Sequence, residues 1–181
     1  MHYRIKRTLA LSLVAMAATT ATAQADIATG VYRMAPGHAT TKAVDVLNFG
    51  QDNGAKVIQN PSNGQLTQRW RIRQTGAASS GAKFYSLSPQ HAQGMCLDVA
   101  GGSTLSGARI VLQSCSSARA SQRWHIFPRN PGLFQITNRN SSMSLQVPSA
   151  SQTNGRQLIQ GTGGAVPEAP HKQFKMTKLS N

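Results

Sequence analysis

The sequence predicts an all-β fold made of three copies of one structural unit. The tripeptide Gln-Arg-Trp occurs twice, and each copy follows an aspartate and, nine residues after that aspartate, a glycine. These residues are Asp45, Gly54 and Trp70 in the first unit and Asp98, Gly107 and Trp124 in the second. A third, altered copy has Gln146, Gly155 and Phe174 at the same places. Three units of roughly fifty residues indicate internal threefold symmetry.

Each unit contains four short strand-like runs separated by Gly, Pro, Asn and Ser. The first unit, about 30–75, has runs at 31–35, 43–47, 55–59 and 68–73; the second, about 82–128, at 83–88, 95–99, 109–113 and 122–127; the third, about 132–178, at 133–137, 143–147, 157–160 and 173–177. Even spacing and the lack of a long helical period favour a closed all-β architecture. Twelve strands in three quartets predict a β-trefoil.

The fourth run of each unit has an apolar face, and in the first two units the opposite face is basic. Alternation along a strand places three pairs in the core, namely Trp70 with Ile72, Trp124 with Ile126, and Phe174 with Met176. The opposite face then carries Arg69, Arg71 and Arg73 in the first unit, and Arg123 and His125 in the second. Such a stripe either binds an anionic polymer or is a solvated strand face.

The chain begins with features of a secretory signal peptide. Basic residues precede an apolar run and an Ala-Gln-Ala sequence that ends at Ala25. We therefore expect residues 1–25 to be removed, leaving 26–181 as a single secreted or periplasmic domain without a transmembrane segment. Loss of Arg4, Lys6 and Arg7 lowers the net charge from +14 to +11. This charge either attracts an anionic partner or keeps an exported protein soluble.

Cys96 and Cys115 are the two cysteines of the chain, and both lie in the second unit. In an oxidising compartment we expect them to form a disulfide. Metal binding is not expected, because no Cys/His set with zinc-site spacing accompanies them.

The repeated landmarks, together with Met-Cys-Leu-Asp-Val at 95–99, closely resemble the ricin B-type lectin repeat. The resemblance covers nearly all of 26–181 and implies one β-trefoil lectin domain. In this family an aspartate accepts hydrogen bonds from two sugar hydroxyls, an aromatic ring stacks on the sugar, and the glutamine of the Gln-x-Trp motif holds the aspartate. By position, this implies sites at Asp45 with Gln68 and at Asp98 with Gln122.

Other positions depart from the family pattern. Asn60 and Gln113 occupy the places of the stacking aromatic residue, and Thr67 and Ser121 those of a sugar-binding asparagine. Phe49, in the turn after Asp45, either replaces the missing aromatic face or packs into the barrel mouth. The third unit has Gln146 and Lys172 in place of aspartate and glutamine, so we expect its role to be structural.

No sequence motif for catalysis or for a cofactor is present. His38 and His91 each lie seven residues before their unit's aspartate and read as repeated turn residues. We therefore expect a binding protein without catalytic residues, cofactor or metal, which recognises glycans through its first two units. The alternative is a basic module that binds an anionic polysaccharide or a partner protein, including the catalytic chain of a secreted toxin.

Overall fold

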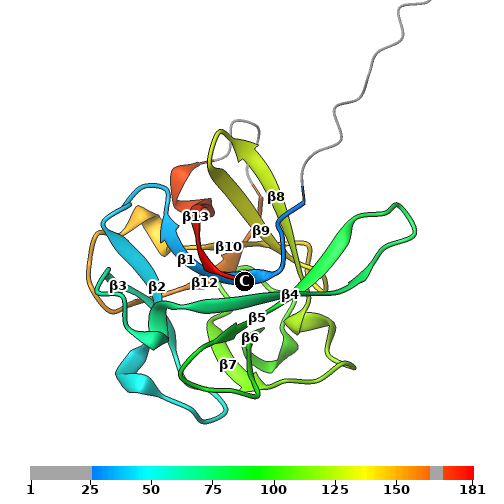
Figure 1. Cartoon of the computed structure of the whole chain (residues 1–181), viewed down its shortest axis with the longest axis horizontal. Coiled ribbons are helices and arrows are strands. Elements are labelled where there is room, and N and C mark those ends of the chain that lie inside the picture. The colour runs from blue at the N-terminus through cyan, green and yellow to red at the C-terminus, as the bar shows by residue number, and fades with distance from the viewer. Residues whose placement is uncertain (1–25, 164–168) are drawn as a thin grey trace, which may run out of the picture.

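The computed structural model describes residues 26–163 and 169–181, so the predicted signal peptide lies outside the described residues. Thirteen β-strands and several short 3₁₀ turns form the described part (Figure 1). No helix among these residues is long and apolar enough to cross a bilayer. The strands are β1 (Gly30–Pro36), β2 (Lys42–Val46), β3 (Val57–Pro61), β4 (Trp70–Ala77), β5 (Lys83–Pro89), β6 (Met95–Val99), β7 (Ile110–Ser114), β8 (Trp124–Asn130), β9 (Leu133–Asn138), β10 (Ser144–Gln146), β11 (Arg156–Gln157), β12 (Ile159–Gly161) and β13 (Gln173–Ser180).

The first and last strands of each unit form a closed six-stranded barrel. Hydrogen-bonded neighbours follow the ring β1, β4, β5, β8, β9, β13 and return to β1. Closure leaves the barrel without a free edge. We call the three units lobes: the first comprises β1–β4, the second β5–β8 and the third β9–β13. The pairing of β13 with β1 joins the third lobe to the first.

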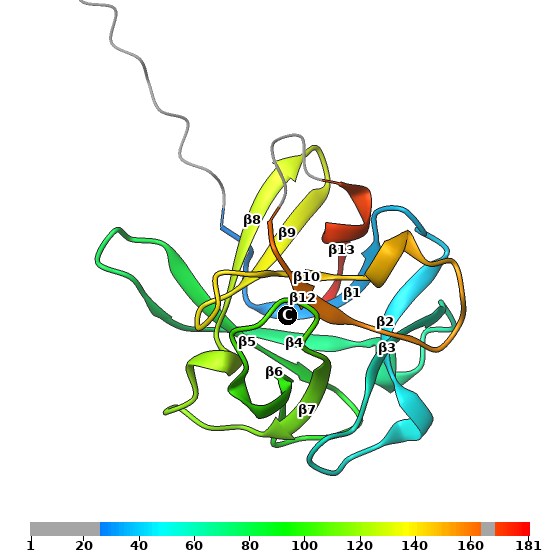
Figure 2. The ribbon, with the colours of Figure 1, turned by 180° about the vertical axis from the view of Figure 1, so that it is seen from behind.

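The two middle strands of each lobe form a hairpin, and the three hairpins lie together at one end of the barrel (Figure 2). β2 pairs with β3, β6 with β7, and β10 with β12. The pairing of β11 with β3, and the bridges Lys56–Val111 and Arg109–Ile159, connect each hairpin to the other two. The predicted all-β trefoil is confirmed.

The three repeated glycines connect neighbouring lobes. Gly54, Gly107 and Gly155 have φ of +90°, +86° and +74°, a left-handed conformation that glycine adopts without steric cost. Each donates its backbone N–H to a carbonyl of the next lobe, and the acceptors are Leu112, Gln160 and Gln59 at 2.8, 2.8 and 2.9 Å. The repeated glycine thus has one structural role in all three lobes.

His38 and His91 provide a second connection between lobes. Nε2 of His38 lies 3.0 Å from the carbonyl oxygen of Ser151, and Nε2 of His91 lies 3.0 Å from that of Gly50. A ring nitrogen that faces a carbonyl oxygen must carry the proton and donate it. In the third lobe Asn140 makes a similar contact, because its Nδ2 donates to the carbonyl oxygen of Gly102 at 2.9 Å. Each of these turn residues therefore fastens its own lobe to the turn of another.

The predicted core residues fill the barrel. Trp70, Trp124 and Phe174 are fully buried, and each indole N–H donates to a carbonyl of its own lobe, Val44 at 2.9 Å and Leu97 at 3.0 Å. Ile72 and Ile126 are buried beside them, whereas Met176 is only half-buried. The alternation read from the fourth strands is therefore correct.

Two details differ from the sequence prediction. Gln68 and Gln122 were expected to begin strands but lie in 3₁₀ turns (Leu66–Gln68 and Ala120–Gln122), because their side chains fold back onto the preceding loop. The third strand of the third lobe is divided into β11 and β12 at Leu158, which donates its N–H to Val57 of the first lobe. Thirteen strands therefore replace the expected twelve.

His125, on the outer side of β8, lies among aromatic rings. Its ring centre is 4.1 Å from that of Phe84 and 5.3 Å from that of Phe127, which it stacks on. Burial lowers the pKa of His125, and the nearby Arg139 lowers it further, although a hydrogen bond with the backbone of Lys83 opposes them. Protonation of this ring is therefore easier in the unfolded chain than in the folded one.

We expect the free energy of unfolding to decrease as the pH falls below 6.5, the ordinary pKa of histidine. In that range the unfolded chain binds a proton at His125 that the folded chain does not, so stability falls with falling pH. Substituting His125→Phe keeps the stacking and removes the titration. Urea unfolding at a series of pH values should give a shallower pH dependence for the variant; an unchanged dependence would rule out this role for His125.

Candidate functional site

A buried hydrogen-bonded pair, Asp45 and Gln68, lies at the base of the first lobe. Asp45 is 3% exposed. Its Oδ1 accepts the N–H of Val46 at 2.7 Å, and its Oδ2 accepts Gln68 Nε2 at 3.0 Å and Asn60 Nδ2 at 3.3 Å. A carboxylate has about four acceptor positions, so one is left for a further donor.

The Gln68 side chain is fully occupied within the protein. Its Nε2 donates both to Asp45 and to the carbonyl of Pro61, the latter at 2.9 Å. Its Oε1 accepts the backbone N–H groups of Asn63 at 2.9 Å and Gly64 at 3.3 Å. Because an amide side chain has two donor and two acceptor positions, none remains for a sugar. Gln68 therefore holds the aspartate and the loop after β3.

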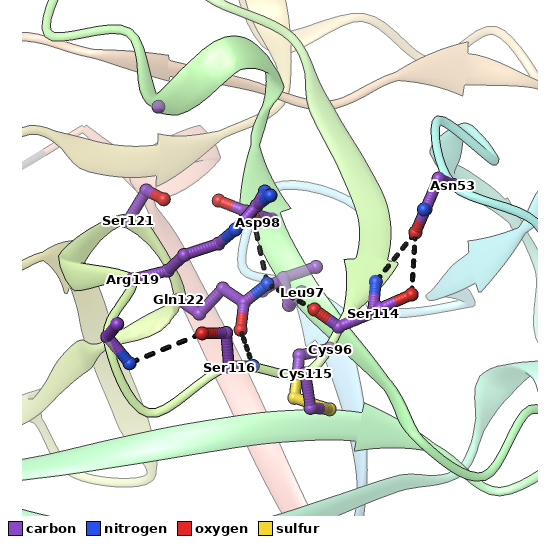
Figure 3. Close-up of polar contacts among 12 residues, drawn as sticks. Asn53, Cys96, Leu97, Asp98, Ser114, Cys115, Ser116, Arg119, Ser121 and Gln122 are labelled. Carbon is purple, nitrogen blue, oxygen red and sulfur yellow. Dashed lines mark hydrogen bonds and ion pairs between the residues drawn. A yellow bond between two sulfur atoms is a disulfide. The ribbon is translucent and has the colours of Figure 1, made fainter.

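The second lobe repeats this pair but covers it with a cation (Figure 3). Gln122 Nε2 donates to Asp98 Oδ2 at 2.9 Å and to Ser114 O at 3.0 Å. Arg119 extends over the pair, with its guanidinium 3.6 Å from the same Asp98 oxygen. Asp98 is 1% exposed, and its Oδ1 has no hydrogen-bond partner among the described residues. Arg119 thus covers the same carboxylate oxygen of Asp98 that Gln122 holds.

In the third lobe a side chain still bonds the carbonyl that follows the third strand, but no aspartate is present. Lys172, at the position of the glutamine, donates from Nζ to Thr162 O at 2.8 Å. This carbonyl corresponds to those of Pro61 and Ser114, which accept the glutamine amides in the other lobes. Gln146 replaces the aspartate, and its Oε1 is buried without a partner among the described residues. The third lobe thus retains the anchor and lacks the carboxylate.

Phe49 is an exposed aromatic residue four positions after Asp45. It belongs to the 3₁₀ turn Leu47–Phe49 that follows β2, and 52% of its surface is exposed. Its φ is +53°, a left-handed conformation that the equivalent Gly102 (φ +62°) and Ala150 (φ +49°) share in the other two lobes. A Cβ added at Gly102 would lie 3.8 Å from Ser121 Oγ, directly before Gln122. By symmetry, Phe49 adjoins the residue before Gln68.

The Phe49 ring does not enter the barrel mouth. It makes an edge-to-face contact with His91 of the second lobe, with ring centres 6.2 Å apart and planes at 89°. His91 is held by its bond to Gly50, the residue after Phe49. One ring of the second lobe thus supports the exposed aromatic residue of the first.

The positions of the missing stacking residues differ between the lobes. Asn60 is half-buried and contacts Asp45 through its amide, so it contributes to the first-lobe site. Gln113 is half-buried in β7, where it pairs with Cys96 of β6. Its side chain makes no hydrogen bond to Asp98 within the described part of the chain. The structure therefore brings Asn60, but not Gln113, onto its aspartate.

Cys96 and Cys115 form the predicted disulfide, with an S–S distance of 2.01 Å. The bond joins β6 to the residue that follows β7, so it closes the second-lobe hairpin. Closing a loop of this length contributes about 3 kcal/mol in the chain-entropy description. Within residues 26–163 and 169–181, no three His, Cys, Asp or Glu side chains are grouped so as to hold a metal ion.

Replacing Gln68 by leucine should destabilise the protein by about 2–4 kcal/mol, because it leaves several buried polar groups unpaired. Gln65→Leu is the matched control, since Gln65 is exposed and lies in the same loop. Urea denaturation of both variants measures the difference. Equal stabilities of the two variants would contradict the structural role of Gln68.

Comparison with solved structures identifies similar folds at low sequence identity. A designed threefold-symmetric protein, ThreeFoil, is 29% identical with a TM-score of 0.72, covering 83% of this chain and 99% of that chain. The Macrolepiota procera ricin B-like lectin, solved in complex with lactose, is 18% identical with a TM-score of 0.66, covering 86% and 100%. A mosquitocidal holotoxin is 16% identical with a TM-score of 0.71; 85% of this chain matches 18% of the toxin.

A comparison with curated protein sequences finds no match. The family model described as ricin-type beta-trefoil lectin domain-like matches residues 66–161, more than half of the chain. This segment runs from the first-lobe glutamine turn to β12 and includes the whole second lobe with its disulfide. The chain belongs to the ricin-type β-trefoil lectin-like family.

Proposed function

We propose that this protein is an exported carbohydrate-binding module whose principal glycan site is in the first lobe. Family membership supports a carbohydrate ligand. The observation that carries the assignment to this lobe is Phe49, an exposed aromatic residue in the turn that follows Asp45 and β2. An exposed aromatic ring at this place distinguishes the first lobe from the other two, which have Gly102 and Ala150 there.

The first lobe offers the two elements that sugar recognition requires. The Phe49 ring presents an apolar face to the C–H side of a sugar ring. Asp45 and Asn60 form the polar side, where the remaining acceptor position of the carboxylate receives a sugar hydroxyl. Because Asp45 is nearly buried, it offers one hydrogen bond at the edge of the site rather than the paired bonds of an open carboxylate. Binding by a single lobe should therefore be weak.

The second lobe acts as a secondary site that opens when Arg119 moves away from Asp98. The Arg119 side chain is 54% exposed and holds Asp98, whose own side chain is 1% exposed, through a long ion pair at 3.6 Å. Because Asp98 is buried, displacing Arg119 would leave its carboxylate without this cation, so a ligand must bring a hydrogen-bond donor of its own to the carboxylate. Engagement of both lobes by a repetitive glycan would then add avidity.

Catalysis is not part of the proposed function. Residues 26–181 contain four aspartates and one glutamate, and Asp45 and Asp98 are occupied in the two buried pairs. Glycoside hydrolysis requires two carboxyl groups on either side of the bond that breaks. Asp26 forms an ion pair with Lys83 at 2.7 Å. The acidic residues thus support binding rather than hydrolysis.

Substituting Phe49→Ala should weaken binding to neutral glycans about tenfold, the effect of losing one aromatic contact of 1–1.5 kcal/mol. A glycan array at low and high salt identifies the ligand, and titration calorimetry then measures the change in affinity. Leu105→Ala is the matched control, because Leu105 is an exposed apolar residue on a second-lobe loop. Equal affinities for the Phe49→Ala and Leu105→Ala proteins would exclude the first-lobe site.

The second candidate function is a basic interaction module that binds an anionic polymer or delivers the catalytic chain of a secreted toxin. It is favoured by the net charge of +11 for residues 26–181 and by the similarity to part of a holotoxin. Binding that disappears in moderate salt, and that neutral sugars do not compete, would favour this function over the first. Copurification of a second chain would favour the toxin role.

A further inference from the structure

A groove of about 680 Å³ lies on the outer surface between the first and second lobes. We call it the arginine groove, after Arg71, Arg73 and Arg123, which line it. Its volume is within the range of ligand-binding pockets. The groove shares no residue with the Asp45–Phe49 site, and none of its lining residues is acidic.

Strand geometry explains how two of the arginines meet in the groove. Arg71 and Arg73 alternate with the core residues of β4, so they share its outer face. On the adjacent strand β5, Ser88 lies opposite Arg71 and Ser86 lies opposite Arg73. This pair of strands continues into a hairpin that projects from the body of the molecule (Figures 1 and 2). The sheet thus presents two arginines beside two hydroxyl groups.

The third arginine comes from the second lobe and is held in place. Arg123 lies between the 3₁₀ turn Ala120–Gln122 and β8, and its guanidinium donates to Ser117 O at 3.0 Å and Ser116 O at 3.3 Å. Both carbonyls follow Cys115, whose disulfide fixes this segment and also lines the groove. Arg123 is therefore a preorganised charge at one side of the groove.

The charges of Arg71 and Arg73 are not neutralised by the protein. Neither side chain forms a hydrogen bond or an ion pair within the described part of the chain. Three guanidinium groups around one groove repel each other, and an anion between them would offset that repulsion. A planar guanidinium also matches the geometry of a sulfate or carboxylate through two parallel hydrogen bonds.

The fold itself does not require these arginines. The positions equivalent to Arg71 and Arg73 are His125 and Phe127 in the second lobe and Lys175 and Thr177 in the third. The three fourth strands form the same barrel with different outer residues. The arginine pair is therefore a feature of one lobe and not of the architecture.

We propose that the arginine groove binds a sulfated polysaccharide. The guanidinium groups receive the sulfate oxygens, while side chains such as Thr75, Gln90 and Gln93 hydrogen-bond to sugar hydroxyls. Single-stranded nucleic acid fits less well, because its binding sites stack bases on aromatic rings and no aromatic side chain lines the groove. The site is independent of the proposed neutral-glycan site in the first lobe.

The test compares dextran sulfate with uncharged dextran, which has the same sugar backbone. Substituting Arg71→Gln together with Arg73→Gln should weaken dextran sulfate binding at least about tenfold and reduce the slope of log affinity against log salt by about 2. The matched control, Arg156→Gln with Lys175→Gln, removes the same charge from exposed residues outside the groove. It should leave the affinity within about threefold of that of the wild-type protein.

Three results would overturn the proposal. Equal losses in the two double variants would mean general adsorption by net charge. Binding of uncharged dextran at the same affinity would mean that the sulfate is not recognised, and equally tight binding of single-stranded DNA would assign the groove to another class of polymer.

Phe49→Ala should leave dextran sulfate binding unchanged, so failure of one proposed site is distinguishable from failure of the other. Arg71→Lys with Arg73→Lys, which keeps the charge but not the paired hydrogen bonds, should give an intermediate affinity.

Discussion

In each of the first two lobes a buried glutamine side chain hydrogen-bonds several segments of the lobe to one another, and much of the structure depends on this interaction. In one side chain, Gln68 joins the end of β2 through Asp45, the end of β3 through Pro61, and the following loop through two backbone N–H groups. The tryptophan two residues later then enters the barrel at a fixed place and donates to β2. A buried polar group without its partner costs about 1–3 kcal/mol, so loss of any one of these bonds would destabilise the fold.

This structural use of the glutamine limits what the same residues can do for a ligand. Gln68 has no hydrogen-bonding position left, and each aspartate presents little of its carboxylate to solvent. The differences among the lobes therefore lie at the rim: Phe49 in the first, Arg119 in the second, and neither an acid nor an aromatic residue at those places in the third. We therefore propose that ligand recognition depends on the rim, while the buried pairs hold the site in shape.

The sequence was sufficient for the architecture because repetition and alternation are local signals. Spacing identified the three units, and period two placed Trp70 and Arg71 on opposite faces of β4. The disulfide followed from the presence of two cysteines in the chain. The 3₁₀ turns at the glutamines were missed, because a side chain that folds back onto its own loop leaves no periodic signal.

Contacts between lobes could not be predicted, because they depend on the barrel closing. The sequence places His38 and His91 in turns, but their acceptors belong to other lobes, more than forty residues away for His91 and more than a hundred for His38. Arg123 of the second lobe and Arg71 of the first lobe line one groove for the same reason. One signal was available for Phe49: a bulky residue stands where the second unit has a glycine.

The central claim is that glycan recognition takes place at the rim of the first lobe and not at three equivalent sites. Backbone amide NMR spectra recorded during titration with the neutral oligosaccharide that binds most strongly on a glycan array test it most directly. We expect the first and largest shifts at Asn48, Phe49, Gly50 and His91, with changes near Arg119 only at higher ligand concentration. Shifts of equal size at the corresponding turns of all three lobes, or first shifts in the third lobe, would contradict it.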